Sequence, residues 1–357
     1  MDSKRRTEYR FVQSDQPDEA AIQDAAAFIR SGRLVAFPTE TVYGLGADAT
    51  NETAVRDIFW AKKRPYSDPL IVHVPSVDDV KLVAATVPPL VYTLAAHFWP
   101  GPLTVIVPRG PTISPVVAAG GETIGVRVPA HPVALALLRA ANTPIAAPSA
   151  NLFMHTSPTT AQHVLDDLQG RIDMVLDAGA SQVGLESTVL DVTVDPPRIL
   201  RPGGITLEAL KEVIGVEPQV SSSSEKPSDQ PQSAPGMLER HYAPRARFIV
   251  FDGHGTSALA GLRLAAWDAL TRGERVGALL ADDEVHFFRD IPVTVATMGR
   301  SDDVEALSRR LYAALREIDD GHVDVIFSHT FGTRGLAFTL RDRLRRAAGG
   351  SFQPVEP

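Results

Sequence analysis

The stretch KKRPYSDPLIVHV, residues 62–74, joins a predicted helix to a predicted strand and sets the alternation that runs through the first part of the chain. Pro65 ends the helix, because the residue before a proline disfavours helical geometry. The aliphatic run 70–74 then has the composition of a buried strand. Lys62 and Arg64 therefore lie at a helix end, where the negative end of the helix dipole by itself gives cations an ordinary structural role.

Polar and cationic residues border apolar runs in the same way elsewhere in the chain. They are Arg127 in TIGVRVP, Ser149 and Asn151 in APSAN, Ser187 in GLESTV and Arg201 in ILRPG. Folding can bring such strand ends to one rim of a single sheet, the usual ligand edge of open α/β sheets. Cations and hydroxyls gathered at one rim predict a pocket for a polyanion.

Each of these residues also has a plain structural explanation. Arg127 stands between valines, and an unpaired guanidinium there is costly to bury, so it needs either a structural acid or a ligand carboxylate. Ser149 and Asn151 suit a helix cap or an Asx turn as well as a ligand rim. His73 interrupts an aliphatic run, where a lone histidine is more often a hydrogen-bonded core residue than a catalyst.

The alternation of elements predicts an α/β domain with a largely covered, mixed sheet. Asp18 caps the first expected helix, and Gly32 closes it. The segment PTETVYGLG, 38–46, favours a tight strand-to-helix connection. Further helices are expected at 53–62, 76–85, 88–97, 132–141, 159–168 and 207–214, and strands at 34–37, 70–74, 103–107, 124–128, 145–147, 174–176, 188–192 and 198–200.

A polar segment divides the chain. PQVSSSSEKPSDQPQSAP, 218–235, has Val220 as its only large aliphatic residue and cannot bury enough surface to offset its ordering entropy. We expect a catalytic domain at 1–215, a linker with a docking segment at 216–245, and a C-terminal domain at 246–357. The last has strands at 247–251, 276–281, 292–298 and 323–327, with helices at 257–271, 304–318 and up to 348. It predicts a smaller, Rossmann-like parallel sheet with an edge strand at 292–298.

Composition narrows the class of protein. The 357 residues carry a formal net charge of −8, which argues against a surface that binds nucleic acid or anionic membrane all over. The absence of cysteine excludes disulfides and thiolate metal sites. No apolar run approaches the roughly 20 residues that span a bilayer, and MDSKRRTEYRF has no signal core. We therefore expect a cytoplasmic protein without a membrane partner.

The ordered motifs of the chain resemble those of the YrdC-like family, in particular the longer threonylcarbamoyl-AMP synthases with a second, C-terminal domain. The motifs are PTETVYGLGADA (38–49), KKRPYSDPLIVHV (62–74), FWPGPLT (98–104), TIGVRVPAHP (123–132), APSAN (147–151), SPTTA (157–161), GLESTVLD (184–191) and ILRPGGI (199–205), then APGMLERHYAP (234–244), LYAALREID (311–319) and DRLRRAAGG (342–350). The resemblance implies a YrdC-like twisted mixed sheet.

The resemblance also implies an enzyme that joins L-threonine, bicarbonate and ATP into threonylcarbamoyl-adenylate and pyrophosphate. A partner transferase would then modify the adenosine beside the anticodon of certain tRNAs, so tRNA contact would be indirect or weak. The threonine site would comprise Thr41, His73, Arg127, Ala147 and Ser187. The nucleotide site would comprise Lys62, Arg64, Asp68, Thr123, Ser149, Asn151, Ser157, Arg201 and Tyr242, with Lys62 and Arg64 catalytic. Mg²⁺ would accompany ATP, with no protein metal site.

Two departures and two alternative functions stand beside this prediction. The family usually has asparagine at Asp68, and the carboxylate either repels phosphate or helps to hold Mg²⁺. Phe153, Met154 and His155 occupy a loop where relatives commonly have a Ser-Gly turn. One alternative is a module whose basic concavity holds RNA; the other is a carbamoyl-transfer maturation factor, whose zinc-binding parts a chain without cysteine lacks.

Overall fold

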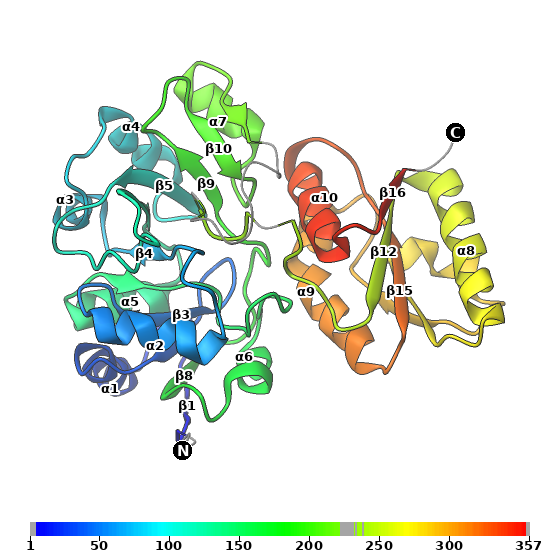
Figure 1. The fold of residues 1–357 in the computed structure, drawn as a ribbon, viewed down its shortest axis with the longest axis horizontal. Coiled ribbons are helices and arrows are strands. Elements are labelled where there is room, and N and C mark those ends of the chain that lie inside the picture. Colours follow the sequence, from blue (N-terminus) through cyan, green and yellow to red (C-terminus); the bar gives the residue numbers. More distant parts are fainter. Residues whose placement is uncertain (1–4, 222–231, 233, 238, 355–357) are drawn as a thin grey trace. The chain divides into compact units, whose positions relative to one another are not determined.

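The chain forms two compact units in a computed structural model that describes residues 5–221, 232, 234–237 and 239–354. Unit 1 comprises Met1–Phe153 and Ser157–Met237, and unit 2 comprises Met154–Thr156 and Leu238–Pro357. Figure 1 shows the strands and helices of each unit in the colours of the sequence. Each unit is described below by itself.

The described part of unit 1 contains an eleven-stranded mixed sheet with the order β1-β8-β2-β3-β7-β4-β6-β5-β9-β10-β11. This confirms the predicted mixed α/β sheet. Its strands are β1 Glu8–Phe11, β2 Val35–Phe37, β3 Gly44–Asp48, β4 Ile71–His73, β5 Leu103–Pro108, β6 Thr123–Arg127, β7 Ile145–Ala146, β8 Met174–Asp177, β9 Thr188–Asp191, β10 Arg198–Arg201 and β11 Gln219–Val220.

The helices of unit 1 begin where the sequence offers capping side chains. Asp18 accepts a hydrogen bond from the Ala21 amide at the start of α1, and Asn51 does the same for α2. Lys63 ends α2 in the left-handed conformation. The helices are α1 Glu19–Arg30, α2 Glu52–Lys62, α3 Val80–Val83, α4 Pro89–Phe98, α5 Pro132–Ala141, α6 Ala161–Leu168 and α7 Leu207–Ile214, with the 3₁₀ turn η1 Val77–Asp79.

Three sequence expectations for unit 1 need correction. The segment PTETVYGLG is more than a connection, because Gly44–Asp48 forms β3 and pairs antiparallel with β2. Gly46 suits that strand because a Cβ there would lie 2.8 Å from the Phe37 ring. The helix expected over 76–85 is divided between η1 and α3. The edge strands β1 and β11 had no counterpart in the prediction.

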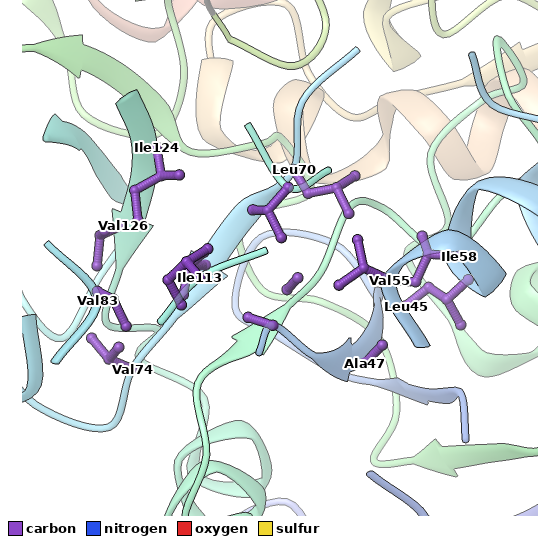
Figure 2. Close-up of a cluster of buried hydrophobic side chains, with 14 of the residues drawn as sticks. Leu45, Ala47, Val55, Ile58, Leu70, Val74, Val83, Ile113, Ile124 and Val126 are labelled. Carbon is purple, nitrogen blue, oxygen red and sulfur yellow. The ribbon is translucent and has the colours of Figure 1, made fainter. Parts of the chain in front are cut away.

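The core of unit 1 lies between the sheet and its helices. Figure 2 shows part of it, where Leu45 of β3 and Val126 of β6 contribute to one cluster with Val55 and Ile58 of α2. All four side chains are fully buried, so each contributes about 1.5–3 kcal/mol relative to an exposed position. This packing fixes α2, and with it the position of Lys62 at its end.

Unit 2 has a five-stranded sheet whose described strand pairs are all parallel, in the order β14-β13-β15-β12-β16. This confirms the predicted parallel sheet, with β14 at an edge. Helix α8 covers one face, and α9 and α10 cover the other (Figure 1). The elements are β12 Arg247–Asp252, α8 Gly255–Thr271, β13 Val276–Leu280, the 3₁₀ helix η2 Asp282–Phe288, β14 Thr294–Thr297, α9 Val304–Asp320, β15 Val325–His329, α10 Gly335–Ala348 and β16 Phe352–Pro354.

Among the described residues, every helix is too short or too polar to cross a bilayer.

Candidate functional site

Three predicted site residues, His73, Arg127 and Arg201, lie on one face of the sheet of unit 1. His73 on β4 lies beside Arg127 on β6 in the parallel register. Two strands further along, Val189 on β9 pairs with Thr104 on β5 and with Arg201 on β10. Val105 on β5 pairs antiparallel with Val126 on β6, which sets Thr104 opposite Arg127. Because partners in register point to the same face, both arginines lie on the same side of the sheet. These residues also lie at one rim of the sheet, as predicted: His73, Arg127 and Arg201 each end their strand, and Ser187 directly precedes β9.

Gly125 keeps this face open next to Arg127. A Cβ at this position would lie 2.9 Å from the Thr104 methyl group and 3.5 Å from Ile71. Any larger residue would therefore have to displace a neighbouring strand's side chain. Gly125 therefore contributes only backbone atoms to the face beside Arg127.

Arg127 has the structural acid that its burial requires. Its Nη2 lies 2.6 Å from Oε1 of Glu40, and its Nε donates to the Gly101 carbonyl at 3.2 Å. Both charged side chains are buried. The Nη1 atom donates no hydrogen bond to any residue within the described ranges, so one edge of the guanidinium is available to a ligand carboxylate. The two partners considered for Arg127 are thus compatible.

His73 is uncharged in the folded protein. Burial, with a smaller contribution from the positive charge of Arg127, lowers the pKa of His73 to about 3. Its ring stands edge-on to Phe37, with centroids 6.2 Å apart. Its Nδ1 is buried and has no hydrogen-bond partner in the described parts of the chain. The site therefore keeps a neutral imidazole beside the arginine at physiological pH.

The low pKa of His73 predicts a pH dependence of stability. The unfolded chain binds this proton below about pH 6.5, whereas the folded protein does so only near pH 3, so the free energy of unfolding falls as the pH drops through that window. The loss from this group is about 2 kcal/mol at pH 5. His73→Gln should lack it. Urea unfolding of wild-type protein and of His73→Gln at pH 7 and pH 5 measures the difference. If the free energy of unfolding changes equally with pH in the two proteins, His73 is protonated at pH 5 in the folded protein.

Lys62 ties the end of α2 to the segment after β7. Its Nζ donates to the carbonyl oxygens of Ser149 and Asn151, both at 2.5 Å, and its own carbonyl accepts the Phe153 amide. The side chain is fully buried. Burial, and then the positive charge of Arg64, lower the pKa of Lys62 well below its usual value. An anion beside it would restore the charged form.

Arg64 and Asp68 form a second buried ion pair. Arg64 Nη2 lies 3.0 Å from Oδ2 of Asp68, and the guanidinium also donates to the carbonyls of Asp68 and Pro69. Burial raises the pKa of Asp68, whereas Arg64, Lys62 and Arg201 act in the opposite direction. The charges of Arg64, Lys62 and Arg201 are therefore close enough to lower the pKa of Asp68 together. The carboxylate of Asp68 in turn neutralises part of this positive charge.

Arg201 joins the strand end of β10 to the start of β9. Its Nη2 donates to the Ser187 carbonyl at 2.9 Å and to the Ser187 hydroxyl at 3.2 Å. The Ser187 hydroxyl is also 2.8 Å from that of Thr104. All three side chains are buried. Ser187 is thus held from two sides, as a positioning group would be.

The segment 234–237 packs against the same face within unit 1. Arg201 Nη1 donates to the Pro235 carbonyl at 3.1 Å, and the Gly236 amide lowers the pKa of Asp68. Ala234 is buried in a cluster with Ile106, Val189 and Leu200. Beside this segment lies a cavity of about 190 Å³, lined by Ile106, Thr123, Gly125, Gln232 and Pro235. A docking segment was expected within 216–245, at the end of the linker.

The remaining predicted residues of unit 1 lie on neighbouring loops and strand ends. The Thr41 hydroxyl is 2.8 Å from that of Thr39, and the Ala147 amide donates to Ile71 at 2.9 Å. Ser149 donates to Oδ1 of Asn151 at 2.6 Å, a local turn contact of the kind expected. Thr123 begins β6 and is partly exposed.

Ser157 is fully buried and donates to Oε1 of Glu186 at 2.7 Å. The preceding residues 154–156 belong to unit 2, so the loop that departs from the family pattern leaves unit 1 after Phe153 and the chain returns to unit 1 at Ser157. Tyr242 also belongs to unit 2, where its ring centroid lies 5.7 Å from that of Tyr312 and the Arg343 guanidinium stands 5.1 Å from it. Its role in the nucleotide site stays a prediction.

Sequence reasoning missed the partners that hold these groups. Glu40, Thr104 and Glu186 are buried and bind Arg127, Ser187 and Ser157 respectively, as described above. Glu40 and Glu186 are acids inside otherwise apolar or hydroxyl motifs, PTETV and GLESTV. A buried acid needs a cation or donor, which is the signal that would have pointed to them.

Within the described ranges, no group of three or more histidine, aspartate or glutamate side chains is placed to hold a metal ion.

Family models match almost the whole chain. The model described as "Telomere recombination", Sua5_yciO_yrdC, matches residues 27–203, and the model for the C-terminal domain of threonylcarbamoyl-AMP synthase matches residues 205–349. Threonylcarbamoyl-AMP synthase from Pyrococcus abyssi is 41% identical over 336 residues, covering 93% of this chain and 95% of the relative. The enzyme of that name from Bacillus subtilis is 42% identical over 337 residues, covering 93% and 94%.

A solved structure shares the fold of the chain. The crystal structure of P. abyssi Sua5 complexed with L-threonine superposes with a TM-score of 0.92 at 40% identity, covering 98% of this chain and 100% of that one. A shorter relative from Mycobacterium tuberculosis is 37% identical over 196 residues, which is 55% of this chain and 90% of the relative.

Proposed function

The chain belongs to the threonylcarbamoyl-AMP synthase family, and we propose that it joins L-threonine, bicarbonate and ATP into threonylcarbamoyl-adenylate with release of pyrophosphate. The observation that carries the proposal is the row of His73, Arg127 and Arg201 on one sheet face, in a fold that in P. abyssi Sua5 was crystallised with L-threonine. A carboxylate site at Arg127 and a phosphate site at Arg201 would then lie within this one row.

The first chemical step is formation of a carbamate. The amine of L-threonine attacks the carbon of bicarbonate, or of the CO₂ it releases, and water leaves. The amine must be neutral to attack, so its proton is lost before or during the step. Nη1 of Arg127 would hold the threonine carboxylate, and the uncharged His73 would not repel an approaching amine.

The second step joins the carbamate to the nucleotide. A carbamate oxygen attacks the α-phosphorus of ATP, and the bond from that phosphorus to the bridging oxygen of pyrophosphate breaks. An anion approaching a triphosphate is strongly repelled. Lys62, Arg64 and Arg201 share one electrostatic field around Asp68, and their charges would stabilise the transition state. Carbamates and adenylates react with water, so a covered site also protects the product.

Mg²⁺ enters this scheme with ATP as part of the substrate. The described residues offer no cage of three acidic or histidine ligands, so the triphosphate itself would supply most of the oxygen ligands that Mg²⁺ prefers. Asp68 is already paired with Arg64. The cationic side chains of the protein and Mg²⁺ would then together neutralise the negative charge of the phosphates.

The product is an activated acyl group and requires an acceptor. We propose that a separate transferase moves the threonylcarbamoyl group to the adenosine next to the anticodon of tRNA. To test the synthase itself, the purified protein is incubated with ATP, Mg²⁺, bicarbonate and L-threonine, and the adenylate is sought by mass spectrometry. A product that needs all three substrates supports the proposal. Its absence from the complete mixture would contradict it.

The aspartate at position 68 predicts a gain of nucleotide affinity when it is neutralised. In Asp68→Asn the backbone carbonyls that hold Arg64 remain, while a negative charge beside the phosphate cations is removed. We expect the KM for ATP to fall about five-fold, or about 1 kcal/mol. Steady-state kinetics measure it, with Asp57→Asn as the control, since Asp57 is paired with Arg5 on another surface. A higher KM would mean that Asp68 helps to hold Mg²⁺.

A further inference from the structure

We propose that Glu40 sets the specificity of the amino-acid site, making it select a zwitterionic α-amino acid over a simple carboxylate anion. The inference rests on the proposed function, in which Arg127 holds the carboxylate of L-threonine. Glu40 would act in two ways, by attracting the ammonium group of the ligand and by neutralising part of the charge of Arg127. It is therefore a specificity-determining residue of the site, distinct from the groups assigned to phosphate.

The position of Glu40 is fixed by its backbone. Its carbonyl accepts the Val183 amide at 2.7 Å, and the next carbonyl, of Thr41, accepts the Gly184 amide at 3.1 Å. The Ser181 hydroxyl donates to the Thr39 carbonyl at 3.1 Å. Three consecutive residues are thus fastened to the segment 181–184, so the carboxylate cannot easily move away from Arg127.

The pair presents two unused atoms of opposite charge. Oε1 of Glu40 lies 2.6 Å from Nη2 of Arg127, and both carboxylate oxygens of Glu40 are buried without a hydrogen bond from the described residues. On Arg127, Nη1 donates no hydrogen bond to any of the described residues. An α-amino acid at neutral pH carries the matching charges, a carboxylate for Arg127 and an ammonium for Glu40. The amine would lose its proton only after binding.

The side chains around Glu40 and Arg127 add no net charge to this ion pair. His73, next to Arg127, and His131, close enough to Glu40 to feel its charge, are both buried, and burial lowers the pKa of each. Neither imidazole adds positive charge at physiological pH. A ligand with only a carboxylate therefore gains the attraction of Arg127 but meets the repulsion of Glu40, while a zwitterion gains from both.

The test compares two ligands that differ by one ammonium group. Calorimetric titration of the full-length protein measures the Kd of L-threonine and of (R)-3-hydroxybutyrate, which keeps the carboxylate and the hydroxyl. Wild-type protein should bind L-threonine at least about ten-fold more tightly. In Glu40→Gln the guanidinium is no longer neutralised, so (R)-3-hydroxybutyrate should bind more tightly than to wild type and the ratio should fall about ten-fold. A structural defect alone would weaken both ligands.

Two further variants serve as controls. Glu40→Asp keeps the charge and should keep most of the selectivity. Glu186→Gln removes another buried carboxylate of unit 1, one that binds Ser157, and should leave the ratio unchanged. If Glu40→Gln does not fold, the wild-type comparison decides: equal affinity for the two ligands overturns the inference.

The outcomes separate this inference from the proposed function. Wild-type protein that does not bind L-threonine at all would overturn the proposed function, and the inference with it. If L-threonine binds wild-type protein and the ratio is the same in Glu40→Gln, the inference alone is wrong.

Discussion

Replacing Arg64 by Gln should lower kcat/KM for ATP about 10³-fold, the size of effect seen when one donor to a developing charge is removed. Arg64 is buried, held by two backbone carbonyls, and shares a field with Lys62 and Arg201. Its charge would act on the α-phosphate as the carbamate approaches. Pyrophosphate release under substrate-limited conditions measures the change.

The control for this prediction is the neighbouring cation. Lys63 is exposed and ends α2 in the left-handed conformation, which asparagine tolerates well. Lys63→Asn should therefore change kcat/KM less than about two-fold. Because losing Arg64 leaves Asp68 buried without its partner, at a cost of about 3–5 kcal/mol, the double variant Arg64→Gln/Asp68→Asn is measured as well. If that double variant is folded and fully active, Arg64 has no role in nucleotide chemistry.

Arg127→Ala should raise the KM for L-threonine about 100-fold while changing the KM for ATP less than about three-fold. The guanidinium is fixed by Glu40 and Gly101 and has one edge left for a carboxylate. Its loss removes a bidentate, charge-assisted contact of about 3 kcal/mol. Initial rates at varied L-threonine and at varied ATP separate the two constants.

A second arginine of unit 1 provides the comparison. Arg171 is partly buried and donates to the Ala61 carbonyl at 3.2 Å, but it lies outside the row of site residues. Arg171→Ala should leave the KM for L-threonine nearly unchanged. If Arg127→Ala loses affinity for ATP and L-threonine equally, the arginine supports the site as a whole and is not a carboxylate clamp.

Much of the fold could be predicted because local signals agree with it. Pro65 marks the end of α2, which the structure places at Lys62, and Asp18 caps α1 as expected. In unit 2 the regular alternation of apolar runs was sufficient to predict parallel pairing and an edge strand at β14. These signals are local, and tertiary packing agrees with them at each point.

Other elements could not be read from the sequence because tertiary pairing decides them. Gly44–Asp48 has two glycines and forms a strand only because β2 and β7 lie on either side of it. The edge strand β11 has two residues, too few for any periodicity. The arrangement on one face follows from the register of β4 with β6 and of β9 with β10, which no spacing along the chain reveals.

The residues of the candidate site also divide into those that local sequence signals reveal and those that only the fold brings together. The cations were visible because a charge at the end of an apolar run is conspicuous. Their buried partners were not, since Glu40 in PTETV carries no local mark of a cation that is 87 residues away and 2.6 Å distant in the fold. The ion pair of Arg64 with Asp68 was open to prediction, because the two lie four residues apart.

The central claim is tested most directly by pyrophosphate release from ATP in bicarbonate buffer with Mg²⁺, with and without L-threonine. The account predicts release that requires both L-threonine and bicarbonate and that stops when either is omitted. Release that ignores L-threonine would contradict the substrate assignment while leaving the nucleotide site in place. A protein that neither binds ATP nor releases pyrophosphate, yet binds RNA with steep salt dependence, would overturn the account altogether.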